Sequence, residues 1–220
     1  MVHDLETNDQ PITIDSGGLS IEGMLHLPKG STEKAPGIVI CHPHPRYGGD
    51  MHNNVVLGLT KRLTRDGFAV LRFNFRGVGG SEGMFDWGGG ETDDADAALE
   101  TLSLHDEVDG SRIGIAGYSF GAAVAIQSAT DSTMAHAVAA IACPAPQFRA
   151  FSGMELLQPK LFVLGDHDHN FPVDQFRFLC RRFADPRQSE VVSGADHFFR
   201  GSEALLGEMT SEFFTTWLKR

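Results

Sequence analysis

The sequence Gly-Tyr-Ser-Phe-Gly at residues 117–121 decides the fold, because it sets a serine between two glycines where an apolar run gives way to a helical one. Residues 112–116 are short and apolar, as in a buried strand, and residues 122–127 are typical of a helix. A serine at such a turn is the layout of a nucleophile elbow. Bulky side chains two positions either side of Ser119 would clash in so tight a turn, which explains both glycines.

An elbow at this position would supply a nucleophile and part of an oxyanion hole. It would push the Ser119 hydroxyl out above the sheet and leave the backbone N–H of Phe120 at a helix N-terminus, where a developing negative oxygen is favoured. The pattern has few fixed positions, so a plain strand-to-helix turn is the alternative. Whether an acid and a histidine follow, in the chain order Ser, Asp, His, is an independent test.

Both residues follow Ser119 in that order. Asp168 lies on the loop after the strand predicted at residues 161–164, and we assign it to orient the imidazole. Asp166, on the same loop, is expected to accept hydrogen bonds from loop amides. His197 lies on a glycine-containing loop before the last predicted helix and is the predicted general base. The alternatives are a solvated turn for the acids and an ordinary polar surface residue for the histidine.

The loop after the strand predicted at residues 38–41 should supply the second oxyanion donor. Pro43 and Pro45 have no backbone N–H, so His44 between them is the natural donor. Arg46 is suited equally to a substrate carboxylate and to a surface acid.

Aromatic residues near the same sheet edge are candidates for the pocket wall. The segments without predicted regular structure, residues 76–90 and 144–158, should border the pocket, because ligands of such sheets bind outside the carboxyl ends of the strands. The pocket candidates are Arg46, Tyr47, Phe85, Trp87, Phe148 and Phe171. The aromatic ones are equally suited to the core. Neither segment is long enough for a large lid, so we expect open access to the serine.

Strands and helices alternate along most of the chain. Residues 11–14 and 19–27 alternate in polarity around Ser-Gly-Gly at 16–18, which predicts an antiparallel hairpin at the sheet edge. Further strands are predicted at 38–41, 69–75, 113–116, 138–142, 161–164 and 190–192, and helices at 53–65, 91–103, from 119, 174–183 and 202–218. This order predicts an α/β fold with a mainly parallel central sheet of about eight strands and helices on both faces.

Composition limits the classes of partner. The 220 residues, 41% of them hydrophobic, fit one domain over residues 1–220 with a core that buries a sheet on both faces. A net charge of −11 without a basic patch argues against nucleic acid or an anionic membrane as main partner.

Residues 1–6 lack a signal-peptide pattern and no stretch is apolar for long enough to span a membrane, which predicts a cytoplasmic protein. Cys41, Cys143 and Cys180 have no paired spacing, which favours free buried thiols. A homodimer through an edge strand or the last helix is compatible with the sequence.

Histidines and acids on two loops also suggest a metal site. They are His42, His44, Asp50, His52, His167 and His169. Imidazoles two residues apart, followed by an acid, can bind zinc. No spacing here matches a strong zinc motif, and an elbow beside these loops already accounts for the site. We therefore predict neither a metal nor a diffusible cofactor.

With these segments located, the chain resembles the α/β-hydrolases over nearly its full length. His-Pro-His-Pro at residues 42–45, Arg-Phe-Asn-Phe-Arg-Gly-Val-Gly at 72–79 and the elbow at 117–121 resemble a group of small bacterial-type serine hydrolases close to the dienelactone hydrolases. True dienelactone hydrolases have a cysteine at the position of Ser119, so their ring-opening reaction is not implied.

The resemblance implies a Ser119, Asp168, His197 triad, with the backbone N–H groups of Phe120 and His44 as oxyanion donors. The expected activity is cleavage of a carboxylic ester with a small or short acyl group through an acyl-enzyme. One alternative is a peptidase or amidase acting on short peptides. Another is a binding protein that keeps the fold without catalysis, because function belongs to the site and not to the fold.

Overall fold

An eight-stranded sheet forms the centre of the molecule in the computed structural model, which describes residues 8–30 and 33–219. The strands are β1 (Asn8–Ser16), β2 (Leu19–Leu27), β3 (Ala35–Cys41), β4 (Ala69–Phe73), β5 (Val108–Tyr118), β6 (Ala137–Ile141), β7 (Lys160–Gly165) and β8 (Arg187–Val192). Their spatial order is β1-β2-β4-β3-β5-β6-β7-β8. Among the described strands, β2 is antiparallel to both of its neighbours, β1 and β4, and all other neighbouring strands are paired in parallel. The predicted mainly parallel sheet with an N-terminal hairpin is thereby confirmed.

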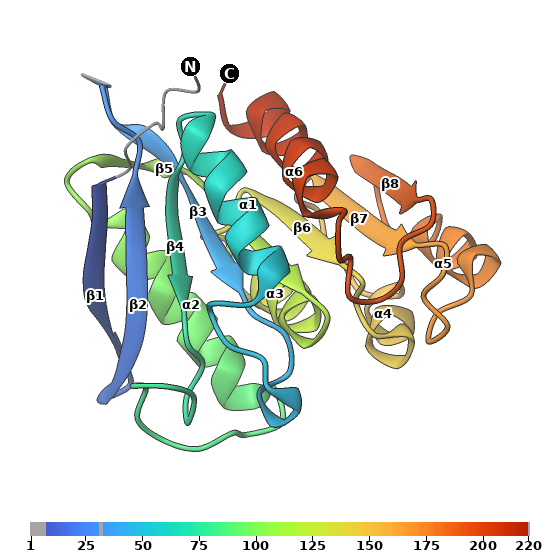
Figure 1. Ribbon diagram of the computed structural model, residues 1–220, viewed down its shortest axis with the longest axis horizontal. Helices are drawn as coiled ribbons and strands as arrows, with labels where there is room; N and C mark the ends of the chain where they lie inside the picture. Colours follow the sequence, from blue (N-terminus) through green and yellow to red (C-terminus); the bar gives the residue numbers. More distant parts are fainter. Residues whose placement is uncertain (1–7, 31–32, 220) are drawn as a thin grey trace.

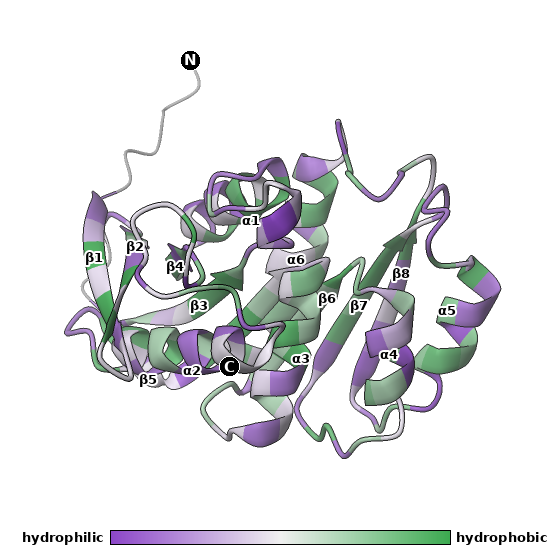
Figure 2. Cartoon of the chain, turned by 90° about the horizontal axis from the view of Figure 1, so that it is seen from below, coloured by the Kyte–Doolittle hydropathy of each residue, from purple (hydrophilic) through white to green (hydrophobic). Residues whose placement is uncertain are grey.

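Helices cover both faces of this sheet. They are α1 (Asn54–Arg65), α2 (Gly89–Ser103), α3 (Phe120–Asp131), α4 (Ala145–Phe151), α5 (Val173–Cys180) and α6 (Glu203–Leu218), with a short 3-10 helix η1 (Pro45–Tyr47). The helices α1 and α6 lie against each other on one face (Figure 1). The other four pack on the opposite face, and Figure 2 shows the sheet between α1 and α2. Helices on both faces of a mainly parallel sheet agree with the predicted α/β fold.

Strand β3 shows how the sequence builds the two core layers. Ile38 and Ile40 contribute to the layer under α1 and α6, and Val39 and Cys41 to the opposite layer, as the two-residue period of a strand requires. All four side chains are fully buried. Burial of each branched side chain contributes about 1.5–3 kcal/mol, which is why strands buried on both faces are continuously apolar.

Helix α4 lies in the segment 144–158, for which the sequence predicts no regular structure. Its N-cap is Pro144, and Pro146 lies in its first turn. A proline costs little there, because the N–H groups of the first turn have no partner within the helix. The two prolines therefore mark the start of a helix in a segment predicted to be irregular.

Several element ends also differ from the prediction, and β5 and β8 begin earlier than predicted, at Val108 and Arg187. Strand β4 ends at Phe73, two residues early, because the amide of Phe75 donates to the imidazole of His42 and not to a neighbouring strand. Helix α5 ends at Cys180 and not at residue 183.

The three cysteines are free and buried, as predicted. No helix among the described residues is both long and apolar enough to cross a membrane. Residues 1–6, to which the signal-peptide argument refers, lie outside the described range.

Candidate active site

The elbow has the strained geometry that its sequence predicts. Ser119 lies between the end of β5 and the start of α3 with φ +56° and ψ −117°, a conformation that costs a non-glycine residue about 1–3 kcal/mol. A Cβ atom at position 117 would lie 2.0 Å from the carbonyl oxygen of Gly121, and one at position 121 would lie 2.3 Å from that of Cys41. Both positions therefore require glycine, for the predicted steric reason.

Ser119, His197 and Asp168 form a continuous hydrogen-bonded relay. The Oγ of Ser119 lies 3.0 Å from Nε2 of His197, and Nδ1 of His197 lies 2.6 Å from Oδ2 of Asp168. A carboxylate at Nδ1 keeps the proton on that nitrogen and leaves the Nε2 lone pair facing the serine hydroxyl. The structure thus brings together three residues from three loops at one edge of the sheet, in an arrangement that can deprotonate the serine.

The environment of Asp168 keeps its carboxylate ionised. Burial alone would raise the pKa of Asp168, but hydrogen bonds from His197 and from the backbone amide of Asn170 outweigh it, and the pKa is lowered. Asp166 has a different partner, since its Oδ1 accepts a hydrogen bond from the amide of Gly194 at 2.6 Å. Asp166 therefore fastens the loop that carries His197, in agreement with the prediction that it bonds loop amides.

The two predicted oxyanion residues lie side by side. The rings of His44 and Phe120 are 5.0 Å apart between centroids. Phe120 is the first residue of α3, so its N–H has no acceptor within the helix. The close approach of Gly121 to the carbonyl oxygens of Cys41 and His42 holds the start of the His44 loop against the elbow.

Four of the pocket candidates surround the same region. The ring of Phe85 lies 4.9 Å from that of His44, and 5.2 Å from that of Trp87. The guanidinium of Arg46 lies 5.2 Å above the Trp87 ring, a cation–π contact. Tyr47 and Trp87 are largely exposed, so these side chains form a rim beside the oxyanion residues.

Phe148 and Phe171 are a correction to the predicted pocket. They are 1% and 2% exposed, and their rings are 5.6 Å apart in an aromatic cluster of the core. The other members of that cluster are Phe162, Phe176 and Phe183. Aromatic side chains serve pocket walls and cores equally well, and here packing between β7, α4 and α5 takes these two into the core.

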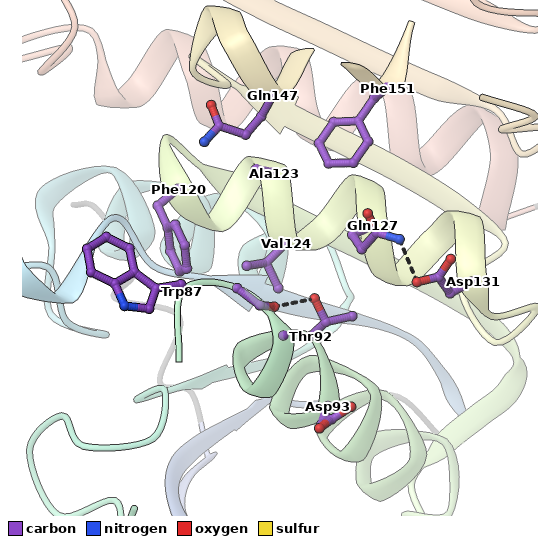
Figure 3. Close-up of a pocket in the computed structure, with 12 residues that line it drawn as sticks. Trp87, Thr92, Asp93, Phe120, Ala123, Val124, Gln127, Asp131, Gln147 and Phe151 are labelled. Atoms are coloured by element: carbon purple, nitrogen blue, oxygen red, sulfur yellow. Dashed lines mark hydrogen bonds between the residues drawn. The ribbon is translucent and has the colours of Figure 1, made fainter. Parts of the chain in front are cut away.

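A groove opens beside the elbow instead, along α3. It is lined by Trp87, Gly88, Gly89, Thr92, Asp93, Phe120, Ala123, Val124, Gln127, Asp131, Gln147 and Phe151, and has a volume of about 440 Å³ (Figure 3). Both segments expected to border the pocket, residues 76–90 and 144–158, contribute to it. The contribution of α3 itself is not predicted from the sequence, because its composition of small apolar residues is equally typical of a fully buried helix.

Tyr118 and His42 support the site without having been predicted to do so. The Tyr118 hydroxyl bonds the backbone of the loop that carries His197. The His42 ring lies 2.7 Å from the carbonyl of Pro43 and accepts from the amide of Phe75. Hydrogen bonds from a side chain to distant backbone have no sequence pattern. With both ring nitrogens engaged, His42 is unavailable to a metal, and no group of three or more His, Cys, Asp or Glu among the described residues could hold one.

Comparison with known proteins identifies the family. The sequence model of the X-Pro dipeptidyl-peptidase (S15) family matches residues 17–166. The chain belongs to this family. The matched segment contains Ser119 and ends before Asp168 and His197, so those two residues rest on the geometry described above.

Related proteins agree on the superfamily. A solved structure of an α/β serine hydrolase homologue from Coxiella burnetii is 36% identical, with a TM-score of 0.83, and the match covers 94% of this chain and 97% of that one. An α/β serine hydrolase without a lid from Xanthomonas campestris is 28% identical, with a TM-score of 0.84 and coverage of 98% and 97%. An uncharacterized protein of Rickettsia prowazekii is 34% identical over 196 residues, 86% of this chain and 82% of that protein. The protein is a hydrolase of the α/β-hydrolase superfamily, whereas its closeness to the dienelactone hydrolases stays a prediction.

Proposed function

We propose that this protein is a serine hydrolase that cleaves a carboxylic ester of a small molecule through an acyl-enzyme. The observation that carries the proposal is the relay from Ser119 through His197 to Asp168, with distances of 3.0 and 2.6 Å. A serine hydroxyl is a weak nucleophile on its own, and an imidazole within hydrogen-bond reach is what activates it.

In the first half of the reaction, Ser119 Oγ attacks the acyl carbon while His197 Nε2 takes its proton. The amide groups of Phe120 and His44 would stabilise the oxyanion, and loss of one such donor typically costs about 3–4 kcal/mol of barrier. Collapse of the tetrahedral intermediate breaks the ester C–O bond, and the leaving alkoxide takes the proton from His197. Water then attacks the acyl-enzyme, gives a proton to His197 and releases the acid, and Ser119 regains its proton.

A second candidate function is cleavage of short peptides, which the family match favours. The same residues would serve, with His197 protonating an amine leaving group. This candidate predicts that p-nitroanilides of X-Pro dipeptides are cleaved with a kcat/KM above that for p-nitrophenyl esters. The opposite order favours the esterase.

Activity-based labelling tests the proposal directly. A fluorophosphonate should add to Ser119 in the folded protein, as read by intact mass and peptide mapping, and Ser119→Ala and His197→Ala should both abolish the label. Hydrolysis of p-nitrophenyl acetate should fall in parallel. A folded wild-type protein that neither takes the label nor cleaves an ester or anilide would overturn both candidates and leave a binding protein on a hydrolase fold.

A further inference from the structure

The groove beside the elbow follows one face of α3. Phe120, Val124, Gln127 and Asp131 recur at intervals of three or four residues, so their side chains lie in a row along the helix. At 1.5 Å per residue the row is about 16 Å long. It starts at a residue whose N–H is assigned to the oxyanion hole, so the groove leads directly away from the position of the acyl carbon.

The two ends of the groove differ in chemistry. Near the elbow the groove is lined by Trp87 and Phe120, with Gln147 of α4 on the same side, and Phe151 of α4 lies farther along, above Gln127 (Figure 3). Toward the far end come Gln127 and Asp131, which are joined by a hydrogen bond of 2.5 Å. An acyl chain that follows α3 would therefore pass Phe120 and Val124 before it reaches Gln127 and Asp131.

The position of His197 decides which half of the ester lies in this groove. The leaving oxygen must come within hydrogen-bond reach of His197 Nε2 to receive its proton. The loop that carries His197, residues 193–200, contributes nothing to the groove lining. The leaving group therefore points toward that loop, and the groove at Phe120 is left for the acyl chain.

Negative charge gathers at the far end. Asp93 and Asp131 line the groove, and no Lys, Arg or His belongs to its lining. Asp96 lies close by, where burial and then the charges of Asp131 and Asp93 raise its pKa. The nearest cationic partner of Asp93 is Arg76, at 4.0 Å. A carboxylate on the end of an acyl chain would thus meet like charges with no cation in the lining to offset them.

We infer that the groove along α3 is the acyl subsite of this enzyme, and that it selects an elongated acyl chain that carries no negative charge. The inference rests on the proposed function and deepens it by naming the substrate class. The occupied length is set by the row from Phe120 to Asp131, and the charge preference is set by Asp93 and Asp131.

A series of p-nitrophenyl esters tests the length preference. From acetate through butyrate and hexanoate to octanoate, kcat/KM should rise at least about tenfold, since each buried CH₂ can contribute up to about fourfold. In Gln127→Trp, an indole fills the middle of the groove, and the octanoate to acetate ratio of kcat/KM should fall about tenfold. Thr130→Trp is the matched control, because Thr130 lies on the same helix outside the groove, and it should keep the wild-type ratio. A flat length series, or equal ratios in both variants, would overturn the inference.

The charge preference is tested with two esters of equal chain length. The mono-p-nitrophenyl ester of octanedioic acid carries a carboxylate where octanoate ends in a methyl, and it should be cleaved at least about tenfold more slowly. Asp93→Asn with Asp131→Asn should narrow this difference. Fluorophosphonate labelling of Ser119 separates the two levels of failure. If the enzyme is labelled but shows no preference for acyl length or charge, the acyl-subsite inference alone is wrong. If the wild-type protein is not labelled, the proposed function is wrong as well.

Discussion

The hydroxyl of Tyr118 donates a hydrogen bond of 2.7 Å to the backbone carbonyl of His197. Tyr118 is the last residue of β5 and precedes the nucleophile directly, so the strand that presents Ser119 also holds the loop that presents its base. The side chain is 3% exposed, and burial raises the pKa of its hydroxyl, which keeps it a neutral donor. The distance between serine and imidazole is thereby fixed through a rigid strand.

Tyr118→Phe should loosen the imidazole without removing any member of the relay. We expect kcat to fall about two- to tenfold with little change in KM, because a single intramolecular hydrogen bond contributes about 0.5–1.5 kcal/mol. Steady-state kinetics on p-nitrophenyl butyrate would measure kcat and KM separately, and urea denaturation would measure stability. An unchanged kcat in a variant that is only less stable would show that Tyr118 has a purely structural role.

The two acids of the β7 loop should differ sharply in their effect on rate. Asp168→Asn replaces the carboxylate at His197 Nδ1 by an amide, which no longer favours the required tautomer, and kcat should fall on the order of 10⁴-fold. Asp166→Asn keeps an oxygen that can accept from the Gly194 amide, so kcat should stay within about threefold of wild type. Single-turnover acylation would compare the variants. If kcat fell further in Asp166→Asn than in Asp168→Asn, Asp166 and not Asp168 would be the residue that orients His197.

The parts of the site that the sequence predicts are those that local sterics and chain order control. An elbow requires small residues at positions 117 and 121 whatever surrounds it, and a Cβ atom at either position would overlap a backbone carbonyl oxygen. The acid and the base follow because parallel strands bring their carboxyl ends, and the loops after them, to one edge of the sheet. Asp168 and His197 are therefore predictable from their places after the last two strands.

The parts that the sequence does not predict depend on packing between distant segments. Phe148 and Phe151 lie three residues apart in one helix and both are buried, yet Phe151 also lines the groove and Phe148 does not. Which face of that helix is buried is decided by α5 and β7, which come later in the chain. The groove likewise exists only because α2 and α4 stand on either side of α3. The type of a residue does not indicate which distant elements will pack against its side chain.

Phe148→Ala should act on stability and not on the chemistry. Its ring is 4.8 Å from that of Phe162 and 5.2 Å from that of Phe183, so truncation leaves a cavity in a closed aromatic cluster. We expect the free energy of unfolding to drop by about 3–5 kcal/mol, measured by urea denaturation. Phe178→Ala is the matched control, because that ring is 55% exposed, and it should change the free energy by less than about 0.5 kcal/mol. A large KM increase in a stable Phe148→Ala protein would return this residue to the pocket.

His42 should make the stability of the protein depend on pH. Its Nε2 accepts a hydrogen bond of 3.0 Å from the amide of Phe75 and must be unprotonated to do so, while Nδ1 bonds the carbonyl of Pro43. Burial lowers the pKa of His42 to about 4, with the Pro43 carbonyl and the charge of Asp50 opposing the shift. The ordinary pKa of a histidine, reached in the unfolded chain, is about 6.5.

Between these two values the unfolded chain binds a proton at His42 that the folded chain does not bind. The contribution of this residue is therefore fully present above about pH 6.5, and it declines as the pH falls, by up to about 1.4 kcal/mol per pH unit. It levels off below about pH 4, where both states are protonated. Urea unfolding at a series of pH values gives the free energy of unfolding as a function of pH. Between about pH 4 and 6.5 this free energy should change less steeply with pH for His42→Gln than for the wild type. His169→Gln, at an exposed histidine, should keep the wild-type slope. Equal slopes in all three proteins would mean that His42 is protonated in the folded state, and the hydrogen bond to Phe75 would then have to be absent in solution.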